Sequence, residues 1–191
     1  GNPPRTTLKL VITEGMTVEE IANKLVSLGV LKDGGEFMEL CRTGAQFRES
    51  YPFVAQIPED PRQQRDYALE GYLFPDTYDF YSYDSAECAK MVVERLIKQT
   101  ETKITDDMYK RADELGYSMN EILTMASIIQ MESGQNTDEM KNVAAVFYNR
   151  LNSKDFGTLG SSPTCYYGDS FKNDDGRYNT YNVKGLPPGP L

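Results

Sequence analysis

Histidine is absent from all 191 residues of this sequence, and tryptophan is absent as well. The lack of imidazole excludes Ser-His-Asp and Cys-His catalysis, and it excludes most zinc sites, which depend on imidazole or clustered thiolates. Without tryptophan, the 13 tyrosines are the main side chains available for stacking against sugars or peptides. Any catalysis by this chain must therefore use carboxylates, hydroxyls, amides or lysine.

Cysteine is scarce, with Cys41, Cys88 and Cys165 as the three examples. They are far apart in the sequence, odd in number and without a C-x-x-C spacing, so no thiolate metal site is indicated. We interpret them as buried or free thiols rather than metal ligands. Neither a metal ion nor a cofactor is expected.

Basic residues are outnumbered, and long apolar runs are missing. The 29 Asp and Glu residues exceed the 20 Lys and Arg residues, which gives a net charge of −9 and a pI near 4.6. A nucleic-acid partner is not expected, because neutralising phosphates requires a basic face. No apolar run approaches the ~20 residues of a membrane-spanning helix, and no signal peptide is present. The start Gly1-Asn2-Pro3-Pro4 resembles a cleavage remnant, so an anchor missing from the sequence stays open.

The first part of the chain predicts a small α/β unit. Residues 7–13 alternate apolar and polar side chains, which is typical of a strand. Thr17-x-x-Glu20 then forms a capping box at the start of a helix with an apolar stripe. About 40 residues bury little apolar surface alone, so residues 5–45 are expected to pack against a neighbour or to act as a small binding module.

Two further segments follow this unit. Residues 46–66 are polar and proline-bearing, so they are predicted to form a connector. Residues 67–191 carry several helical patterns, but from Gly157 onward the sequence is irregular and rich in Gly, Pro, Ser, Tyr and Asn. Such a long loop is normally either disordered or functional, and the many tyrosines with few charges favour an ordered loop.

One helix of this last segment ends in a carboxylate. Ser118-x-x-Glu121 is a capping box that begins the helix, and apolar residues recur after it at helical spacing. Glu132 stands four residues after Ile128, so we expect it to continue the buried stripe at the negative end of the helix dipole. Both effects favour the neutral acid, which can donate a proton. The alternative is a solvated surface residue before Ser133-Gly134, an ordinary helix stop.

Four motifs occur in order along nearly the whole chain: Glu70-Gly-Tyr-Leu-Phe-Pro-Asp-Thr-Tyr78, Ala126-Ser-Ile-Ile-Gln-Met-Glu132, Val143-Ala-Ala-Val-Phe-Tyr-Asn-Arg-Leu151 and Tyr178-Asn-Thr-Tyr-Asn-Val-Lys-Gly-Leu-Pro-Pro-Gly-Pro190. Each motif alone is weak, but the ordered set is specific. Together they resemble the YceG-like endolytic lytic transglycosylases of bacterial peptidoglycan. The resemblance implies cleavage of the MurNAc–GlcNAc bond within a glycan strand, which leaves a 1,6-anhydro-MurNAc end.

The resemblance also implies a single catalytic Glu at the end of a helix, commonly followed by Ser, as in Glu132-Ser133. A competing alignment puts the catalytic position at Gln130, which lies ~200° from Glu132 around the helix and off the apolar face. The implied fold class is α+β. It consists of a small LysM-like α/β module (5–45), a connector (46–66) and a mainly helical, lysozyme-like catalytic domain (67–191) with a long irregular C-terminal loop region.

Several residues besides Glu132 are candidates for holding the sugar and the peptide stem, although each also fits a structural role. They are Ser133, Asn149, Tyr178, Asn179, Tyr181 and Glu70. Arg150 is a candidate partner for an anionic lactyl or stem carboxylate, with a helix-surface salt bridge as the alternative.

The chain departs from the family pattern in two places. An acidic and an amide group are missing at Leu159-Gly160-Ser161-Ser162. Family members also usually continue past the final Leu-Pro-Pro-Gly-Pro, so we expect a catalytic domain truncated at its C-terminus.

Two other functions stay open. A hydrolytic muramidase would need Glu70 or Asp76 opposite Glu132, because ordinary glycosidases use two carboxylates. A non-catalytic peptidoglycan-binding scaffold agrees with the LysM-like module and with the departure near Ser162. The implied partners are peptidoglycan glycan strands, with cell-wall synthases as candidate partner proteins. The implied location is the extracytoplasmic face of the bacterial cytoplasmic membrane, through an N-terminal anchor outside this sequence.

Overall fold

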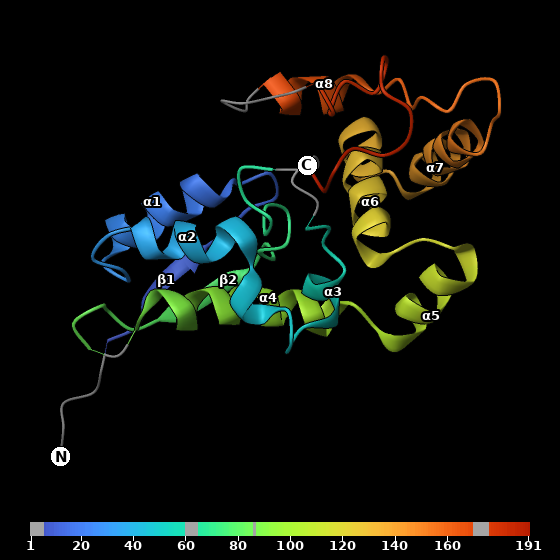
Figure 1. The fold of residues 1–191 in the computed structure, drawn as a ribbon. Helices are drawn as coiled ribbons and strands as arrows, with labels where there is room; N and C mark the ends of the chain where they lie inside the picture. The colour runs from blue at the N-terminus through green and yellow to red at the C-terminus, as the bar shows by residue number, and fades with distance from the viewer. Residues whose placement is uncertain (1–5, 60–64, 86, 170–175) are drawn as a thin grey trace. The chain divides into compact units, whose positions relative to one another are not determined.

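The computed structural model describes residues 6–59, 65–85, 87–169 and 176–191. The chain divides into two compact units, whose elements are labelled in Figure 1. The N-terminal unit comprises Gly1–Ala55 and Tyr67–Asp106, and the C-terminal unit comprises Gln56–Asp66 and Asp107–Leu191. Each unit is therefore built from two separate stretches of the chain.

A two-stranded antiparallel sheet joins the two stretches of the N-terminal unit. Strand β1 (Leu8–Val11) pairs with β2 (Thr77–Phe80), so that Leu8 lies opposite Phe80. Side chains alternate in burial along both strands, as one buried sheet face requires. The helices of this unit are α1 (Val18–Leu28), α2 (Gly35–Thr43), the 3-10 helix η1 (Ala45–Phe47), α3 (Pro52–Ala55) and α4 (Ala89–Lys103).

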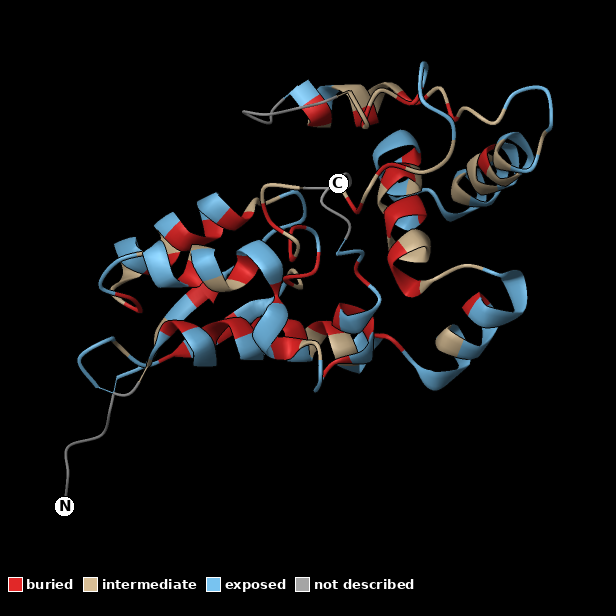
Figure 2. Cartoon of the chain, viewed as in Figure 1, coloured by how far each residue is buried: buried red, intermediate tan, exposed pale blue. Residues whose placement is uncertain are grey.

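The apolar core of the N-terminal unit takes side chains from both stretches. The capping box at Thr17 and Glu20 is formed, and it begins α1 as predicted. Helix α2 packs against α4, and buried positions (red in Figure 2) occur along α1, α2 and α4. Fully buried side chains come from both strands and all three of these helices: Leu10, Leu25, Phe37, Phe80 and Leu96.

These packing units do not coincide with the boundaries predicted from sequence. Residues 5–45 are predicted to be a small module that packs against a neighbour or binds a ligand, and in the structure β1 has its strand partner in residues 77–80. A single strand cannot satisfy its backbone alone, and pairing with β2 supplies the partner. The segment 46–66, predicted as a connector, contains η1 and α3, and it buries Phe47 and Phe53. The functional assignment of 5–45 and 67–191 stays a prediction.

The C-terminal unit is helical, and α6 lies at its centre. Its helices are α5 (Asp106–Leu115, whose first residue falls in the other unit), α6 (Met119–Ser133), α7 (Thr137–Leu151) and α8 (Ser162–Asp169). Helix α6 packs against both α7 and α8. The capping box of Ser118 and Glu121 begins α6 as predicted.

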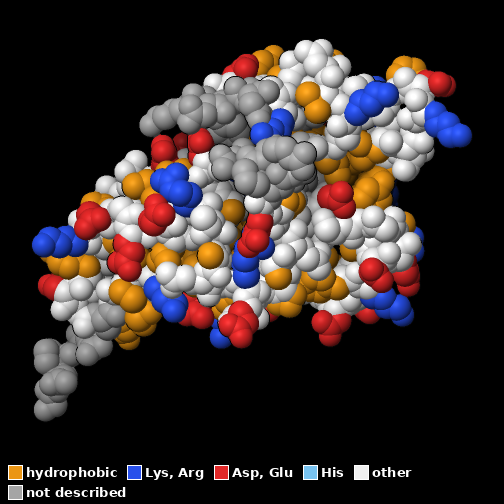
Figure 3. Space-filling view, in the orientation of Figure 1, with side chains coloured by type: hydrophobic (Ala, Val, Ile, Leu, Met, Phe, Trp, Pro, Cys, Tyr) orange, Lys and Arg blue, Asp and Glu red, His pale blue; other side chains and the backbone are white. Residues whose placement is uncertain are grey.

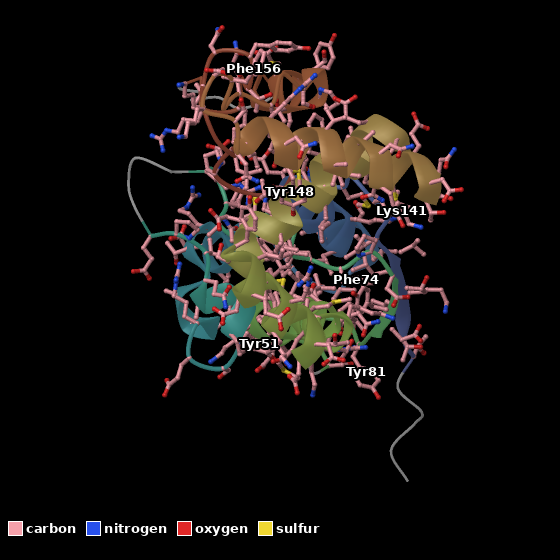
Figure 4. The ribbon with its side chains drawn as sticks, turned by 90° about the vertical axis from the view of Figure 1, so that its right-hand side faces the viewer. Tyr51, Phe74, Tyr81, Lys141, Tyr148 and Phe156 are labelled. Carbon is pink, nitrogen blue, oxygen red and sulfur yellow. The ribbon has the colours of Figure 1, made fainter. Side chains whose placement is uncertain are left out.

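Tyr148, labelled in Figure 4, contributes to this unit from α7. Its ring meets that of Tyr117 edge-on, with centroids 5.4 Å apart. Burial, followed by the nearby charges of Tyr117 and Glu121, raises the pKa of the Tyr148 phenol. The phenol therefore stays protonated at neutral pH.

Apolar contacts hold the described residues after Gly157, which are 158–169 and 176–191, and the predicted irregularity is only partly right. Leu159 is fully buried in a cluster with Met125, Ile128 and Phe147, against which Leu186 and Leu191 also pack. The segment also forms α8, which the sequence pattern did not indicate. Pro163 lies in the first turn, where proline is tolerated, but a helix of eight residues is too short to be stable alone, so α8 depends on tertiary packing rather than propensity. The predicted α+β class is confirmed.

Charged side chains of both signs are interspersed on the face drawn in Figure 3. No helix within the described ranges combines the length and apolar character that crossing a membrane requires.

The shared sheet of the N-terminal unit gives a first prediction. Leu10→Ala should destabilise this unit by about 2–5 kcal/mol, because it removes a fully buried side chain. Lys9→Ala is the control, since Lys9 is exposed in an ion pair with Asp79, and its effect should stay within about 0.5 kcal/mol. Native-state hydrogen exchange should show that Leu10→Ala accelerates exchange in residues 8–11 and 77–80 together. Unchanged protection of 77–80 would contradict a shared unit.

Candidate active site

Glu132 lies in the last turn of α6, and its side chain is exposed. It follows Ile128 on the same side of the helix, as predicted. The predicted burial is wrong, because Glu132 is exposed although Met125 and Ile128 earlier on the same helix are buried in the apolar cluster.

The carboxylate is nevertheless held by a specific contact. Ser161 Oγ donates a hydrogen bond of 2.7 Å to Glu132 Oε1. The other oxygen, Oε2, has no hydrogen-bond partner among the residues that the structure describes. One oxygen is thus anchored while the other remains available for chemistry.

Hydrogen bonds of its own backbone hold Ser161 in place. It is fully buried, and its N–H donates to Thr180 Oγ1 at 2.9 Å. Its carbonyl oxygen accepts from Thr164 Oγ1 at 2.8 Å, and the hydroxyls of Thr164 and Thr180 lie 2.9 Å apart. Buried polar groups that satisfy one another in this way hold a single geometry. The network joins the end of α6 to α8 and to the segment that carries Thr180.

An exposed tyrosine and an arginine border the same segment. Tyr181 is 55% exposed, and its hydroxyl lies 2.9 Å from Ser162 Oγ. Arg150, in the last turn of α7, donates to the carbonyl oxygen of Leu159. Gly160 lies between them with φ +63°, and a Cβ there would stand 3.5 Å from both the Arg150 guanidinium and the Tyr181 ring. The arrangement therefore brings a carboxyl, a phenol and a guanidinium to one segment of the chain.

The family model described as the YceG-like family matches residues 2–191. The chain belongs to the YceG-like family. A crystal structure at 2.6 Å of a YceG-like protein from Listeria monocytogenes is similar to this YceG-like chain, with 32% identity and a TM-score of 0.72. That match covers 95% of the present chain and 62% of the Listeria chain.

Two curated relatives of this YceG-like chain carry the name endolytic murein transglycosylase. The protein of Bacillus subtilis strain 168 is 38% identical over 64% of this chain and 35% of its own length. The protein of Streptococcus pneumoniae serotype 2 strain D39 is 29% identical over 95% of this chain and 36% of its own length. The chain thus matches about a third of the length of these relatives.

Three of the predicted substrate-binding residues of the YceG-like chain have internal partners. Ser133 is buried, and its Oγ donates to the Ile129 carbonyl oxygen at 2.5 Å. Tyr178 is buried, and its hydroxyl donates to the Gly189 carbonyl oxygen at 3.3 Å. Asn179 Oδ1 accepts from the Tyr181 N–H at 3.3 Å. The bond of Ser133 stabilises the last turn of α6, and the bonds of Tyr178 and Asn179 stabilise the C-terminal segment.

The remaining two candidates lie elsewhere. Asn149 is exposed on α7, next to Arg150 in the sequence. Glu70 belongs to the N-terminal unit, where it is 8% exposed, and both of its oxygens accept from the Val18 N–H at 3.2 Å. Val18 is the first residue of α1, so this carboxylate stabilises a helix N-terminus, in agreement with the alternative interpretation as a cap acceptor. Burial, and then the charge of Glu70, raises the pKa of the Cys41 thiol.

No sequence pattern indicated the hydroxyl network of Ser161, Thr164 and Thr180. Gly160–Ser162 stood out only as a departure from the family pattern. No local spacing indicates that residue 161 meets residue 132, because this contact depends on the fold of the unit. Within the described ranges, no group of three or more His, Cys, Asp or Glu side chains is arranged to hold a metal ion.

The position of Glu70 gives a second prediction. Glu70→Gln should destabilise the N-terminal unit by about 1–3 kcal/mol, because it replaces a buried, charge-assisted acceptor at the start of α1. Glu14→Gln, an exposed change in the same unit, should stay within about 0.5 kcal/mol. Urea unfolding at pH 7 compares the two variants. An equally small effect for both would show that the Glu70 charge does not support α1.

Proposed function

We propose that this chain forms part of an endolytic peptidoglycan lytic transglycosylase. It cleaves the bond between MurNAc and GlcNAc within glycan strands and leaves 1,6-anhydro-MurNAc ends. Its membership of the YceG-like family and the names of its curated relatives support this class of reaction. The observation that carries the residue assignment is the hydrogen bond from Ser161 to Glu132.

Glu132 acts as the general acid and then as the general base. Its Oε2 gives a proton to the glycosidic oxygen while the bond from C1 breaks and an oxocarbenium-like transition state develops. The resulting carboxylate takes the proton of the C6 hydroxyl of the same MurNAc as that oxygen forms its bond to C1. The substrate supplies its own nucleophile, so neither water nor a second carboxylate takes part.

Ser161 orients this carboxyl group. The hydrogen bond to Oε1 fixes the plane of the carboxyl group and leaves Oε2 for proton transfer. Positioning of this kind lowers the barrier because the reacting groups are held near their reactive geometry before the step begins.

Exposed side chains of the segment after Ser161 and of α7 supply the substrate contacts in this proposal. Tyr181 offers a ring and a hydroxyl to a sugar, and Arg150 offers a guanidinium to an anionic lactyl or stem carboxylate. Asn149 is the third contact. Ser133, Tyr178 and Asn179 contribute indirectly, because they hold the backbone that carries these groups.

The finer domain assignments belong to this proposal. The LysM-like module of residues 5–45 contributes to glycan binding, and residues 67–191 supply a lysozyme-like catalytic domain. The substrate places the protein on the extracytoplasmic side of a bacterial membrane. Cell-wall synthases, which make the glycan strands, are the proposed partner proteins.

The role of Glu132 gives a third prediction. In the full-length protein, Glu132→Gln should reduce formation of anhydro ends by about 10²–10⁴-fold or more, because an amide can neither donate the proton nor accept it back. Gln130→Ala is the matched control, because Gln130 lies on the same helix but ~200° around it from Glu132. This variant should retain activity. Chromatography of digested glycan strands measures both variants. Wild-type activity of Glu132→Gln would assign the chemistry to another residue.

The role of Ser161 gives a fourth prediction. Ser161→Ala should lower kcat about tenfold and leave KM unchanged, because the hydroxyl contacts Glu132. The bonds to Thr164 and Thr180 use the Ser161 backbone, which alanine retains, so unfolding should change by no more than about 1 kcal/mol. A loss of stability without a loss of kcat would make Ser161 a purely structural residue.

A further inference from the structure

A cavity of about 550 Å³ lies at the amino end of α6, the end remote from Glu132. It belongs entirely to the C-terminal unit. Its floor includes Ser118, Asn120 and Glu121 of the first turn of α6, and its wall includes Arg177 and Lys184 of the C-terminal segment. None of these residues was assigned to substrate binding from the sequence.

The charge of this cavity is opposite to that of the whole chain. Arg177 and Lys184 bring two cations to a protein whose net charge is −9. The one acidic side chain of the lining, Glu121, already accepts the Ser118 N–H at 2.8 Å in the capping box. The positive end of the α6 dipole points to the same place. A carboxylate is therefore the charge that this cavity favours.

The other lining groups suit an extended peptide. Gln56 contributes a carboxamide, a group that can pair with a peptide backbone. Asn120 is 4% exposed and donates to the Pro188 carbonyl oxygen at 3.2 Å, so it fixes the lining rather than offering a contact. Pro58, Pro187 and Pro188 form apolar walls for small side chains. Gln56 Oε1 accepts the Met119 N–H at 2.6 Å, which holds this side chain against α6.

Lys184 is held in position rather than extended freely into solvent. Its backbone forms an isolated bridge with Thr158, and its side-chain carbons lie over Gly157, 3.3 Å from where a Cβ would stand. A restrained lysine loses less conformational entropy when it pairs with an anion.

One segment of chain connects this cavity with the site at Glu132. Residues 177–188 line the cavity with Arg177, Lys184 and Pro188, and between them Thr180 binds Ser161, the partner of Glu132. Along α6, the twelve residues from Asn120 to Glu132 correspond to ~18 Å. An extended peptide of five residues spans ~17 Å. The two lengths are comparable, so a stem peptide attached to a sugar at Glu132 reaches the amino end of α6, where the cavity lies.

We propose that this cavity binds the free carboxyl end of a peptidoglycan stem peptide, through Lys184 and Arg177. The proposal rests on the function proposed above, because it takes the same substrate and adds a second point of recognition. The cavity thereby favours strands that carry intact stems over strands from which the peptides have been removed.

The test is an NMR titration of the 191-residue protein with muramyl pentapeptide. One form of the probe carries a free C-terminal carboxylate, and the other carries a C-terminal carboxamide. The carboxylate form should shift the amide signals of Asn120, Glu121 and Lys184 and bind about tenfold more tightly than the carboxamide form. Lys184→Gln should remove this difference, because it removes one cation and keeps a side chain of similar length. Lys154→Gln, an exposed lysine outside the cavity, is the control and should preserve the difference.

Equal binding of the two probes, or signal shifts that avoid the cavity, would overturn the proposal. An equal effect of Lys154→Gln would also overturn it, since the effect would then reflect overall charge. The titration needs no cleavage, so its outcome is separate from that of the proposed activity. In a digest by the full-length protein, Lys184→Gln should slow cleavage of stem-bearing strands several-fold and leave stem-free strands unaffected. Failure to cleave either substrate would count against the activity and not against this cavity.

Discussion

The hydrogen bond between Ser161 and Glu132 ties the end of α6 to the C-terminal segment, and the candidate site depends on it. An exposed carboxylate at the end of a helix normally samples several rotamers. Here a fully buried serine restricts one of its oxygens, and two threonines restrict the serine. Without this chain of contacts, Glu132 would be an ordinary surface residue.

Apolar packing sets the distances that make this contact possible. Leu159 is buried against Met125, Ile128 and Phe147, so the chain just before Ser161 is fixed against α6 and α7. Leu186 and Leu191 pack on the same cluster and fix the far end of the segment. This cluster brings α6 and the chain before Ser161 together. The polar network then sets only the local geometry of Ser161 and Glu132.

Local signals in the sequence predicted local structure well. The capping boxes at Thr17 and Ser118 form, and so do the strand at Leu8–Val11 and the long helix that ends near Glu132. Three features that depend on tertiary contacts differ from what the sequence indicated. The boundary of the N-terminal packing unit differs from the predicted one, because β1 pairs with a strand about 70 residues later in the chain. Helix α8 forms through tertiary packing, which no local pattern indicates. The periodicity of α6 gives the face on which Glu132 lies but not whether another element covers that face, and Glu132 is exposed.

In the proposed mechanism, the C6 hydroxyl of MurNAc, and not water, attacks C1 with Glu132 as the acid and base. Digestion of glycan strands by the full-length protein in water labelled with oxygen-18, followed by mass spectrometry of the new ends, tests this claim most directly. A transglycosylase adds no water, so the account predicts anhydro-MurNAc ends without the label. Labelled reducing ends would show that water is the nucleophile, and they would contradict the account.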